Sequence, residues 1–376
     1  MSIKDHKYFM QQALNEALKG WGKVSPNPLV GAVVVDENNQ IIGRGHHEYA
    51  TKYHAEINAL NSAINNLLNR NLNYHNFDDK NQLLNNKDEK LLKNCTVYVT
   101  LEPCSSFGRT APCTEALKSC NVKKVVIGCE DDNSLHLNKA EKILQAASIK
   151  VISNIEEQQC RNVNETFFKW IKTKKPFVIL KMAMTLDGKI ATKEGQSKWI
   201  TGAVARQRVQ ELRKWSDAIL VGAETARLDK PSLTIRDVNN NILDHWTQPK
   251  RIILSNNQDK KFYENILSAN GGEISVASLN NRNDWNLFLT ELGAQNITSL
   301  LIEGGGSVAA AALNAQIVDK IEFHVAPKIL GGKESRPVVS GENPLSLAEA
   351  HNLKDIKIIK YGNDIAISGY CDDKKL

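Results

Sequence analysis

Aromatic side chains are scarce in this sequence, and its basic residues do not cluster. Phe, Trp and Tyr make up 6% of the 376 residues, and a formal charge of +6 arises from 48 basic and 42 acidic residues spread along the chain. A protein that follows a nucleic-acid strand needs a basic groove with aromatic side chains on which bases stack. The composition therefore favours a small anionic substrate over a nucleic acid.

Long apolar runs and dense cysteines are also missing. No uninterrupted apolar segment reaches the roughly 20 residues that cross a bilayer, and the N-terminal MSIKDHKYFM lacks an apolar core followed by a small-residue cleavage site. The seven cysteines are an odd set without the spacing of a secreted disulfide framework. We expect reduced thiols, no membrane partner and a cytoplasmic location.

The length and patterning predict two α/β domains. A chain of 376 residues exceeds the usual size of one hydrophobic core. Strands alternate with helices in residues 1–150, which predicts a first α/β domain. The expected elements of this domain are 5–20 (helix), 29–36 and 41–45 (strands), a helix from about 54, and 95–101 and 122–128 (strands).

Two stretches interrupt or follow this pattern. The Asn-rich residues at about 62–94 are expected to form an inserted surface excursion, with a substrate lid or a partner contact as the alternative. Residues 151–175 are expected to form a connecting helix and linker, because Pro176 follows a charged stretch. The alternation then restarts, so residues 176–376 are predicted to form a second α/β domain.

Four residues of the first domain have the chemistry of a catalytic zinc site. His54 and Glu56 stand two positions apart, and eight residues separate Cys104 from Cys113. One imidazole and two thiolates suit Zn²⁺, and three protein ligands leave the fourth tetrahedral position to water, as in catalytic sites. Glu56 can then move protons without binding the metal. The alternative is a surface histidine with two core thiols.

The helix expected after Cys104 supports this interpretation. Pro112 is expected at its first helical position, which places Cys113 where the helix dipole favours a thiolate. Zinc deaminases share the His-x-Glu and Pro-Cys arrangement, but their usual two-residue cysteine spacing is absent here.

The motifs around these residues resemble the riboflavin biosynthesis deaminases. The resemblance is carried by PNPLVGAVVV at 26–35, HAE at 54–56 and LEPCSSFGRTAPC at 101–113. The eight-residue cysteine spacing with Gly-Arg-Thr inside it distinguishes this family from cytidine and tRNA deaminases.

The resemblance implies a cytidine-deaminase-like α/β/α fold and a zinc site. By this resemblance, zinc is held by His54, Cys104 and Cys113, Glu56 is the proton donor, and Asn27 and His47 contact the substrate. The neighbouring His46 could equally be the relevant histidine. Two departures from the family are Ala111, where a proline is usual, and residues 131–139, which lack the family's prolines and glycines. The second departure puts enclosure of the substrate in doubt and predicts slower deamination.

A glycine run marks the second domain. Glu303 and three glycines follow an apolar strand and precede an alanine-rich helix, so bare backbone amides can approach a dinucleotide phosphate. Taken alone, the run could equally be a tight connection, and it is not the Gly-x-Gly-x-x-Gly pattern.

Four segments of this domain resemble the reductase partner of the same family, whose fold is dihydrofolate-reductase-like. They are KMAMTLDGKIAT at 181–192, SKWITG at 197–202, LDKPSLTIR at 228–236 and IEGGGSVAAAAL at 302–313. The resemblance implies an NADPH site lined by Ala183, Trp199, Thr225, Asp229, Gly305, Gly306, Ser307 and Val308. It implies substrate contacts from Lys181, Ser197, Arg213, Leu233, Arg236 and Glu303.

Some of these roles have a physical reason. The guanidinium groups of Arg213 and Arg236 suit the ribose phosphate, because a planar fork binds phosphate oxygens in bidentate fashion. Lys181 is the candidate proton donor for the reduction. The preference for NADPH over NADH is implied by the resemblance alone.

The combined prediction is a bifunctional α/β enzyme of riboflavin biosynthesis that binds one zinc ion and NADPH. It would deaminate 2,5-diamino-6-ribosylamino-4(3H)-pyrimidinone 5′-phosphate and then reduce the ribosyl side chain to ribityl. The alternatives are a reductase with a zinc-binding but inactive deaminase-like domain, and a nucleic-acid-editing deaminase. The resemblance also implies a homodimer formed through the reductase half.

Overall fold

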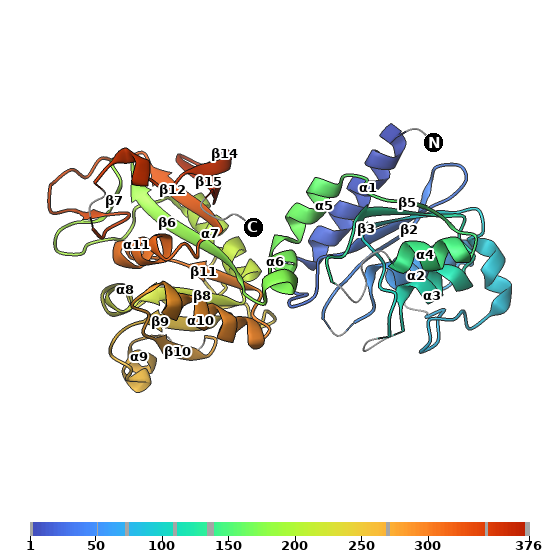
Figure 1. Cartoon of the computed structure of the whole chain (residues 1–376), viewed down its shortest axis with the longest axis horizontal. Helices are drawn as coiled ribbons and strands as arrows, with labels where there is room; N and C mark the ends of the chain where they lie inside the picture. The colour runs from blue at the N-terminus through green and yellow to red at the C-terminus, as the bar shows by residue number, and fades with distance from the viewer. Residues whose placement is uncertain are drawn as a thin grey trace. The chain divides into compact units, whose positions relative to one another are not determined.

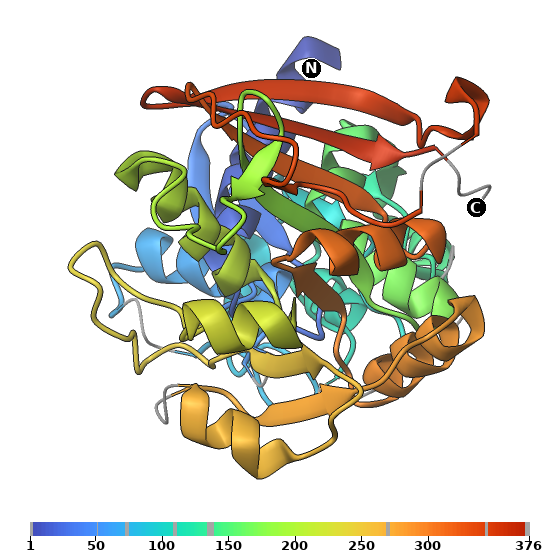
Figure 2. The same cartoon turned by 90° about the vertical axis from the view of Figure 1, so that its left-hand side faces the viewer.

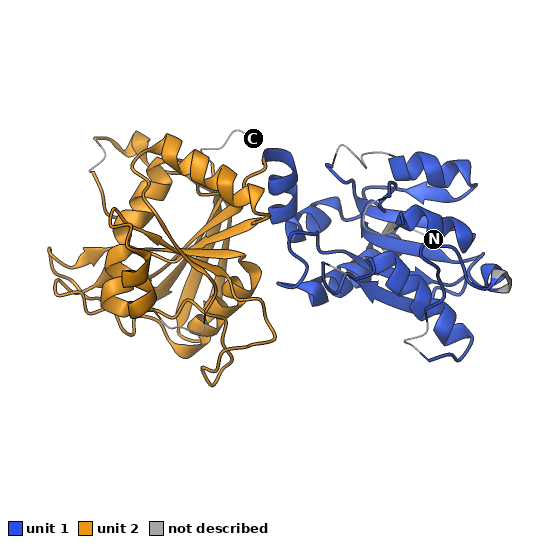
Figure 3. Cartoon of the chain, turned by 90° about the horizontal axis from the view of Figure 1, so that it is seen from below, with its two compact units in different colours: residues 1–173 blue, residues 174–376 orange. Residues whose placement is uncertain are grey.

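The chain forms two compact units, Met1–Thr173 and Lys174–Leu376 (Figure 3). The computed structural model describes residues 3–50, 52–71, 75–107, 111–133, 139–267, 271–342 and 345–372. In the described parts of the chain, every helix is too short or too polar to span a lipid bilayer. Each unit has its own sheet and core, and each is an α/β fold as predicted.

Unit 1 is a five-stranded sheet with helices on both faces (Figure 1). Its helices are α1 (Ile3–Ala17), α2 (Ala55–Leu67), α3 (Cys113–Ser119), α4 (Lys139–Ala146), α5 (Glu157–Val163) and α6 (Glu165–Thr173), with short 3-10 turns η1 (Leu18–Gly20) and η2 (Asn86–Leu91). Its strands are β1 (Gly31–Val35), β2 (Ile41–His46), β3 (Thr96–Leu101), β4 (Lys124–Cys129) and β5 (Lys150–Ile152).

The strand order in unit 1 is β2-β1-β3-β4-β5. Strand β1 pairs antiparallel with β2 and β3, whereas β3, β4 and β5 run parallel. All five residues of β1 are buried, as its run of β-branched side chains predicts. One face packs against α1, α5 and α6, and the other packs against α2, α3 and α4. This is the α/β/α architecture expected for the first domain.

Close packing of α2 on strand β2 fixes the position of the start of this helix. A Cβ atom added to Gly43 or Gly45 of β2 would lie 2.4 or 2.3 Å from backbone atoms of Ala59. Only glycine permits this approach. The start of α2, beside Ala55, is thereby held against the end of β2.

Most of the segment expected to connect the two domains is part of unit 1, which ends at Thr173. Residues 151–175 include most of β5 and the whole of α5 and α6, and Cys160 and Phe167 belong to the core beneath α1. The stretch expected as an inserted surface excursion at about 62–94 also contributes to the core, since Phe77, Leu83 and Leu92 are buried. The apolar side chains of these three residues pack beside α2 and α3, so the insertion is anchored to the core of unit 1.

Unit 2 is an eight-stranded sheet with helices on both faces. Its helices are α7 (Ala203–Trp215), α8 (Ala223–Asp229), α9 (Lys260–Ile266), α10 (Arg282–Ala294) and α11 (Gly306–Asn314), with a 3-10 turn η3 (Leu347–Glu349). Its strands are β6 (Phe177–Thr185), β7 (Lys189–Ala191), β8 (Ala218–Gly222), β9 (Lys250–Leu254), β10 (Ile274–Ala277), β11 (Ser299–Ile302), β12 (Lys320–Ala326), β13 (Arg336–Pro337), β14 (Leu353–Tyr361) and β15 (Asp364–Cys371).

The strand order in unit 2 is β10-β9-β8-β11-β6-β12-β15-β14, and β7 pairs separately with β13. The six strands from β10 to β12 are parallel, and β15 and β14 extend the sheet antiparallel. Figure 2 shows the red β14–β15 hairpin at one edge of this sheet. Ligands of parallel α/β sheets bind beyond the carboxyl ends of the strands, which is where the segments after β8 and β11 lie.

Candidate active sites

His54, Cys104 and Cys113 meet at the start of α2 and α3. Their ligand atoms lie within 4.8 Å of one another. The Nδ1 atom of His54 is 3.5 Å from the sulfur of Cys104 and 3.3 Å from the sulfur of Cys113. Zinc bonds of about 2.3 Å to sulfur and about 2.0 Å to nitrogen at tetrahedral angles place such donors roughly 3.5 Å apart. The donor set and its spacing therefore fit a zinc ion, with Nδ1 as the imidazole donor.

The protonation of this cluster reflects burial and mutual hydrogen bonding. The Cys113 thiol and the His54 imidazole hydrogen-bond to Cys104 and lower its pKa, while the same contact with Cys104 raises the pKa of Cys113. The backbone N–H of Cys113 also donates to the Cys104 sulfur at 3.2 Å. Burial raises the pKa of Glu56 to about 7. These contacts favour the thiolate at Cys104 and the protonated thiol at Cys113, whereas zinc ligation would require both sulfurs to be deprotonated.

Helix α3 begins at Cys113, but the expected place of Pro112 is one residue out. Pro112 has φ −65° and ψ 144°, so it occupies the extended N-cap position and not the first helical position. Its ring still fixes φ at the entrance to the helix. Cys113 is consequently the first helical residue, where its backbone N–H is available to the Cys104 sulfur.

The structure places His47, and not His46, beside the cluster. The rings of His47 and His54 are 5.3 Å apart, edge to face. The Nδ1 atom of His47 donates to the Tyr53 carbonyl at 3.1 Å, so its Nε2 accepts from the Asn27 amide at 3.0 Å. His46 instead lies 4.0 Å from the Glu16 carboxylate. Burial lowers the pKa of His47, which favours the neutral ring.

The loop containing Asn27 is held by a residue that belongs to none of the motifs recognised in the sequence. Asn164, which is 1% exposed, accepts from the Leu29 N–H at 2.7 Å and donates to the Leu29 carbonyl at 2.9 Å. Asn164 lies between α5 and α6. The segment expected as a linker therefore braces the loop beside the metal cluster.

The altered loop at 131–139 is described only at its ends, because residues 134–138 lie outside the described residues. At these ends, the Glu102 carboxylate accepts from the backbone N–H groups of Asp131 at 3.3 Å and Ala140 at 3.1 Å. Glu102 directly follows β3 and precedes Cys104 by two positions. The ends of the loop are thus tied to the strand that leads into the cluster.

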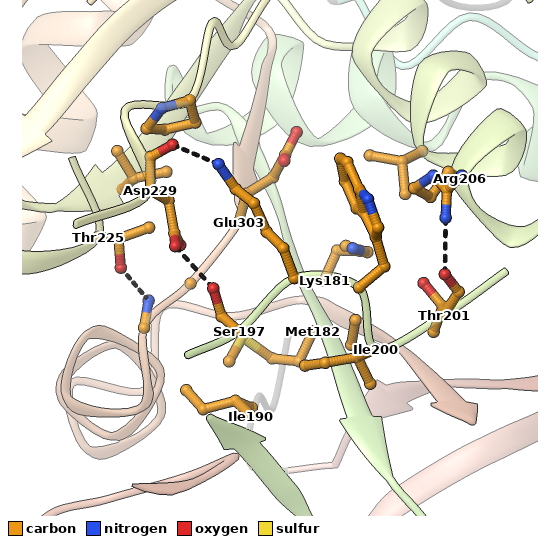
Figure 4. A pocket seen from close by; sticks show the side chains of 18 of the residues that line it. Lys181, Met182, Ile190, Ser197, Ile200, Thr201, Arg206, Thr225, Asp229 and Glu303 are labelled. Carbon is orange, nitrogen blue, oxygen red and sulfur yellow. Dashed lines mark hydrogen bonds between the residues drawn. The ribbon is translucent and has the colours of Figure 1, made fainter. Parts of the chain in front are cut away.

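A cavity of about 970 Å³ in unit 2 collects the predicted residues of the second domain (Figure 4). It lies in the size range of small-molecule and cofactor sites. Thirteen of the fourteen predicted residues line it: Lys181, Ala183, Ser197, Trp199, Arg213, Thr225, Asp229, Leu233, Arg236, Glu303, Gly305, Gly306 and Ser307. Val308 stands apart, because its side chain belongs to the core and packs near Gly222.

The two predicted phosphate-binding arginines differ in their contacts. Arg213 forms a bidentate ion pair with Glu303, at 2.7 and 2.8 Å, and also donates to the Thr234 carbonyl. Both side chains of the pair are largely buried. Arg236 donates to the Thr234 hydroxyl and to Asn240, which is exposed. The guanidinium fork of Arg213 is therefore occupied within the protein, whereas Arg236 is more accessible to a ligand.

The glycine run after β11 meets α8 in the cavity. Gly304 has φ +114°, and Gly305 is the N-cap of α11 and donates to the Thr225 hydroxyl at 3.3 Å. A Cβ atom on Gly306 would lie 2.6 Å from the Pro337 carbonyl oxygen. These glycines carry no side chains of their own over the start of α11, so a phosphate group can approach the backbone amides there closely.

The segment before α7 forms another wall of the cavity. Ser197 donates to the Asp229 carboxylate at 2.7 Å, and the two side chains point toward each other in Figure 4. The guanidinium of Arg206 stacks over the ring of Trp199, 4.5 Å from its centroid. Trp199 is 66% exposed, so it presents a flat surface at the cavity and is not a core residue.

A second ion pair beneath α7, between Arg208 and Glu322, was not predicted from the sequence. Arg208 binds Glu322 of β12 in bidentate fashion, at 3.0 and 2.9 Å, and the Nε2 atom of His324 lies 2.9 Å from Glu322. His324 is fully buried. Charged residues at alternate positions of a strand are ordinarily solvent-facing, so the pattern gave no signal that α7 covers them. Arg208 thus joins α7 to β12, and Arg213 joins it to the segment that follows β11.

Comparisons with known proteins agree with both halves. Residues 3–129 match the cytidine and deoxycytidylate deaminase zinc-binding region, and residues 176–367 match the RibD C-terminal domain. The riboflavin biosynthesis protein RibD of Actinobacillus pleuropneumoniae is 34% identical over 383 residues, which cover 96% of this chain and 93% of that relative. The RibD of Escherichia coli (strain K12) is 31% identical over 386 residues, which cover 96% of this chain and 98% of that relative.

Solved structures give the same result. Acinetobacter baumannii RibD superposes with a TM-score of 0.80 at 32% identity, covering 98% of this chain and 99% of that one. The diaminohydroxyphosphoribosylaminopyrimidine deaminase/5-amino-6-(5-phosphoribosylamino)uracil reductase of Thermotoga maritima superposes with a TM-score of 0.80 at 31% identity and the same coverage. The fold and sites thus define a two-domain enzyme with a zinc-type deaminase domain and a reductase domain. The chain belongs to the RibD family of riboflavin biosynthesis proteins, which confirms the resemblance found in the sequence.

Proposed function

We propose that this chain catalyses two consecutive steps of riboflavin biosynthesis. The first is hydrolytic deamination of 2,5-diamino-6-ribosylamino-4(3H)-pyrimidinone 5′-phosphate, which releases ammonia. The second is NADPH-dependent reduction of the ribosyl side chain, giving 5-amino-6-(5-phosphoribitylamino)uracil. The observation that carries the proposal is the convergence of His54, Cys104 and Cys113 in one unit of a chain whose other unit holds the 970 Å³ cavity.

In the first step, His54, Cys104 and Cys113 hold one zinc ion. When bound, zinc supplies Lewis-acid activation of a water molecule. Glu56 is buried beside the cluster and is not a ligand, so it can take a proton from water and give one to the departing amine. Asn27 and His47 orient the pyrimidine, since their side chains are hydrogen-bonded to each other beside His54.

In the second step, the cavity of unit 2 holds both substrate and cofactor. NADPH, when bound, supplies the hydride. The amides at the start of α11 receive its diphosphate, while Ala183, Trp199, Thr225 and Asp229 line the rest of its site.

The substrate of this step lies against the charged wall of the cavity. Arg236 is the principal phosphate contact, because the fork of Arg213 is engaged by Glu303. Ser197 and Leu233 line the same cavity. Lys181 is the proton donor: burial lowers its pKa, although Glu303 opposes that shift, and a lower pKa makes proton release easier.

The test follows both products in one reaction. The purified protein is incubated with the diaminopyrimidine ribosyl phosphate, with and without NADPH, and ammonia release and NADPH oxidation are recorded. Ammonia release that does not require NADPH, followed by NADPH consumption, supports the proposal. Reduction of supplied deaminated intermediate without any ammonia release would instead identify a reductase with an inactive deaminase-like unit.

We also propose that two copies associate through unit 2. Strand β14 is an edge strand of the eight-stranded sheet, and most of its residues are exposed. Ile356, Ile358 and Ile359 are 48%, 68% and 47% exposed on this strand. An edge strand offers unpaired backbone groups to another chain, and the exposed isoleucines between the lysines of β14 add apolar area to such a contact. A second copy that covers these isoleucines would remove them from water.

A further inference from the structure

The stretch between α2 and β3 contains a small ordered hairpin beside the metal cluster. Phe77 and Leu83 pair as an isolated bridge, and both side chains are buried. At the tip, the Asp78 carboxylate accepts from the backbone N–H groups of Lys80 and Gln82, each at 2.8 Å. The hairpin is therefore built to hold one conformation.

One end of this hairpin is bound to α2, the helix that follows His54. The buried side chain of Asn76 donates to Asn65 at 2.8 Å and to Asn61 at 3.2 Å, and its backbone N–H donates to Asn61 at 2.9 Å. Arg70 adds bonds to Asn76 at 2.6 Å and to Asp88 at 2.9 Å. The hairpin and α2 are thus joined through several buried polar side chains.

The tip of the hairpin is bound to the entrance of α3, the helix that begins with Cys113. The amide of Asn81, a residue that is 4% exposed, donates to the Ala111 carbonyl at 2.7 Å and to the Pro112 carbonyl at 3.3 Å. The Ser119 hydroxyl of α3 lies 3.4 Å from the Asn81 carbonyl oxygen and also bonds Ala116. Asn81 therefore contacts the two peptide groups that immediately precede Cys113.

The backbone at Asn81 suits this contact. Its φ is +57°, a left-handed conformation that asparagine tolerates better than most residues. The Cys113 backbone N–H donates to the Cys104 sulfur at 3.2 Å, so a shift of the Pro112 peptide would move both sulfurs. Outer-shell groups of this kind orient metal ligands, and their loss costs about 10- to 100-fold in metal affinity.

We propose that Asn81 is a positioning residue for the metal site. Through Asn81, residues 75–92, which contain the hairpin, hold Cys113 at its position beside His54. The inference rests on the proposed zinc-dependent deaminase function and assigns a role to a stretch that the proposed reaction does not otherwise use. Asn81 does not touch the metal or the substrate. It acts by fixing the peptide groups before Cys113, while Asn76 fixes the same hairpin to α2.

The test compares two glycine variants of the full chain. Asn81→Gly keeps a residue that tolerates positive φ and removes only the side-chain amide. Asn69→Gly is the matched control, because Asn69 also has positive φ, at +51°, and is exposed. Asn81→Asp is a second variant, of nearly the same shape, that places a carboxylate oxygen against the two carbonyl groups.

Zinc affinity is measured by competition with a chelator, and ligand geometry by the absorption spectrum of the cobalt-substituted protein. We expect Asn81→Gly and Asn81→Asp to bind zinc about 10-fold or more weakly, with an altered cobalt spectrum, while Asn69→Gly stays within about twofold of wild type. Reduction of supplied deaminated intermediate by unit 2 should be unchanged in all variants, which verifies folding of the rest of the chain.

The outcomes separate this inference from the function on which it rests. If wild type binds zinc and releases ammonia but Asn81→Gly matches Asn69→Gly in affinity and spectrum, the positioning role is wrong. A lower melting temperature of zinc-free Asn81→Gly with wild-type zinc affinity would also overturn it, because Asn81 would then be only structural. A wild-type protein that binds no zinc would overturn the proposed deaminase function itself.

Discussion

Replacement of Glu322 by glutamine removes a buried carboxylate whose contribution to stability depends on pH. Burial alone would raise the pKa of Glu322, but hydrogen bonds from His324 and Arg208 hold it at about 2 in the folded chain. Its side chain is 7% exposed, so solvent screens these contacts little. Relative to the ordinary value of 4.5, this pKa corresponds to roughly 3 kcal/mol of stabilisation at neutral pH.

The sign of the pH dependence follows from the lowered pKa. The carboxylate stabilises the folded chain fully above the pKa that it has when unfolded, and this contribution fades as the pH falls from about 5 towards 2. Glu322→Gln should therefore cost roughly 3 kcal/mol at pH 7, since it removes the carboxylate and leaves the partly buried Arg208 without its charged partner. Between pH 7 and pH 3, the difference between wild type and variant should shrink by roughly 2 kcal/mol.

Urea unfolding of the full chain at several pH values measures this difference. Hydrogen exchange of peptides from β12 identifies the transition of unit 2. Glu264→Gln is the control, because its pair with Lys260 is exposed and 3.6 Å long, and its loss should change stability by less than about 1 kcal/mol. If wild type and Glu322→Gln lose stability in parallel as the pH falls, the reasoning is refuted.

Three further predictions concern the sites and the assembly. In steady-state assays of the reductase, Arg236→Met should raise the KM for the phosphorylated substrate about 10- to 100-fold. The KM for NADPH should stay constant. An unchanged KM for the substrate would contradict the phosphate contact. Chelation of zinc should abolish ammonia release and leave reduction of supplied deaminated intermediate intact, and added zinc should restore ammonia release. Ammonia release that persists after chelation would exclude the role of the metal. Ile358→Asp should convert a dimer to monomers in light scattering, because it buries a charge in the β14 contact; a dimeric variant would place the interface elsewhere.

Much of the fold was predictable because local patterns agree with burial. Strands such as β1, β4 and β8 are apolar runs, and a continuous apolar run predicts a strand that is buried on both faces, as these are. Strand β14 is not evident from the sequence, because four of its nine residues are charged and its exposed apolar residues follow no regular alternation. Strands β5, β7 and β10 have three or four residues, too few for a period to be evident.

The site was predictable where chemistry and motif coincide. The combination of one histidine, two cysteines and one glutamate at these spacings indicates a catalytic metal site. The structure brings His54, Cys104 and Cys113 together. Neutral asparagines that act through backbone groups carry no such signal. Asn164 hydrogen-bonds the peptide groups of Leu29, 135 positions away, and only the tertiary fold brings the two together.

The pairing of Arg213 was also beyond the sequence. Glu303 lies 90 positions away, and either residue alone is compatible with a ligand contact. The bidentate pair shows that a charged side chain at a site can serve to hold its neighbour. Arg236, which has an exposed partner in Asn240, is consequently the better candidate for the phosphate.

Glu56→Gln in the two-product assay tests the central claim most directly. The glutamine keeps the size of the side chain and removes its ability to transfer protons. We predict that the variant still binds zinc and still reduces supplied deaminated intermediate with NADPH, while its ammonia release falls by at least about 100-fold. Ammonia release at the wild-type rate from Glu56→Gln would contradict the assignment of this carboxylate, and with it the proposed deamination at the His54, Cys104 and Cys113 cluster.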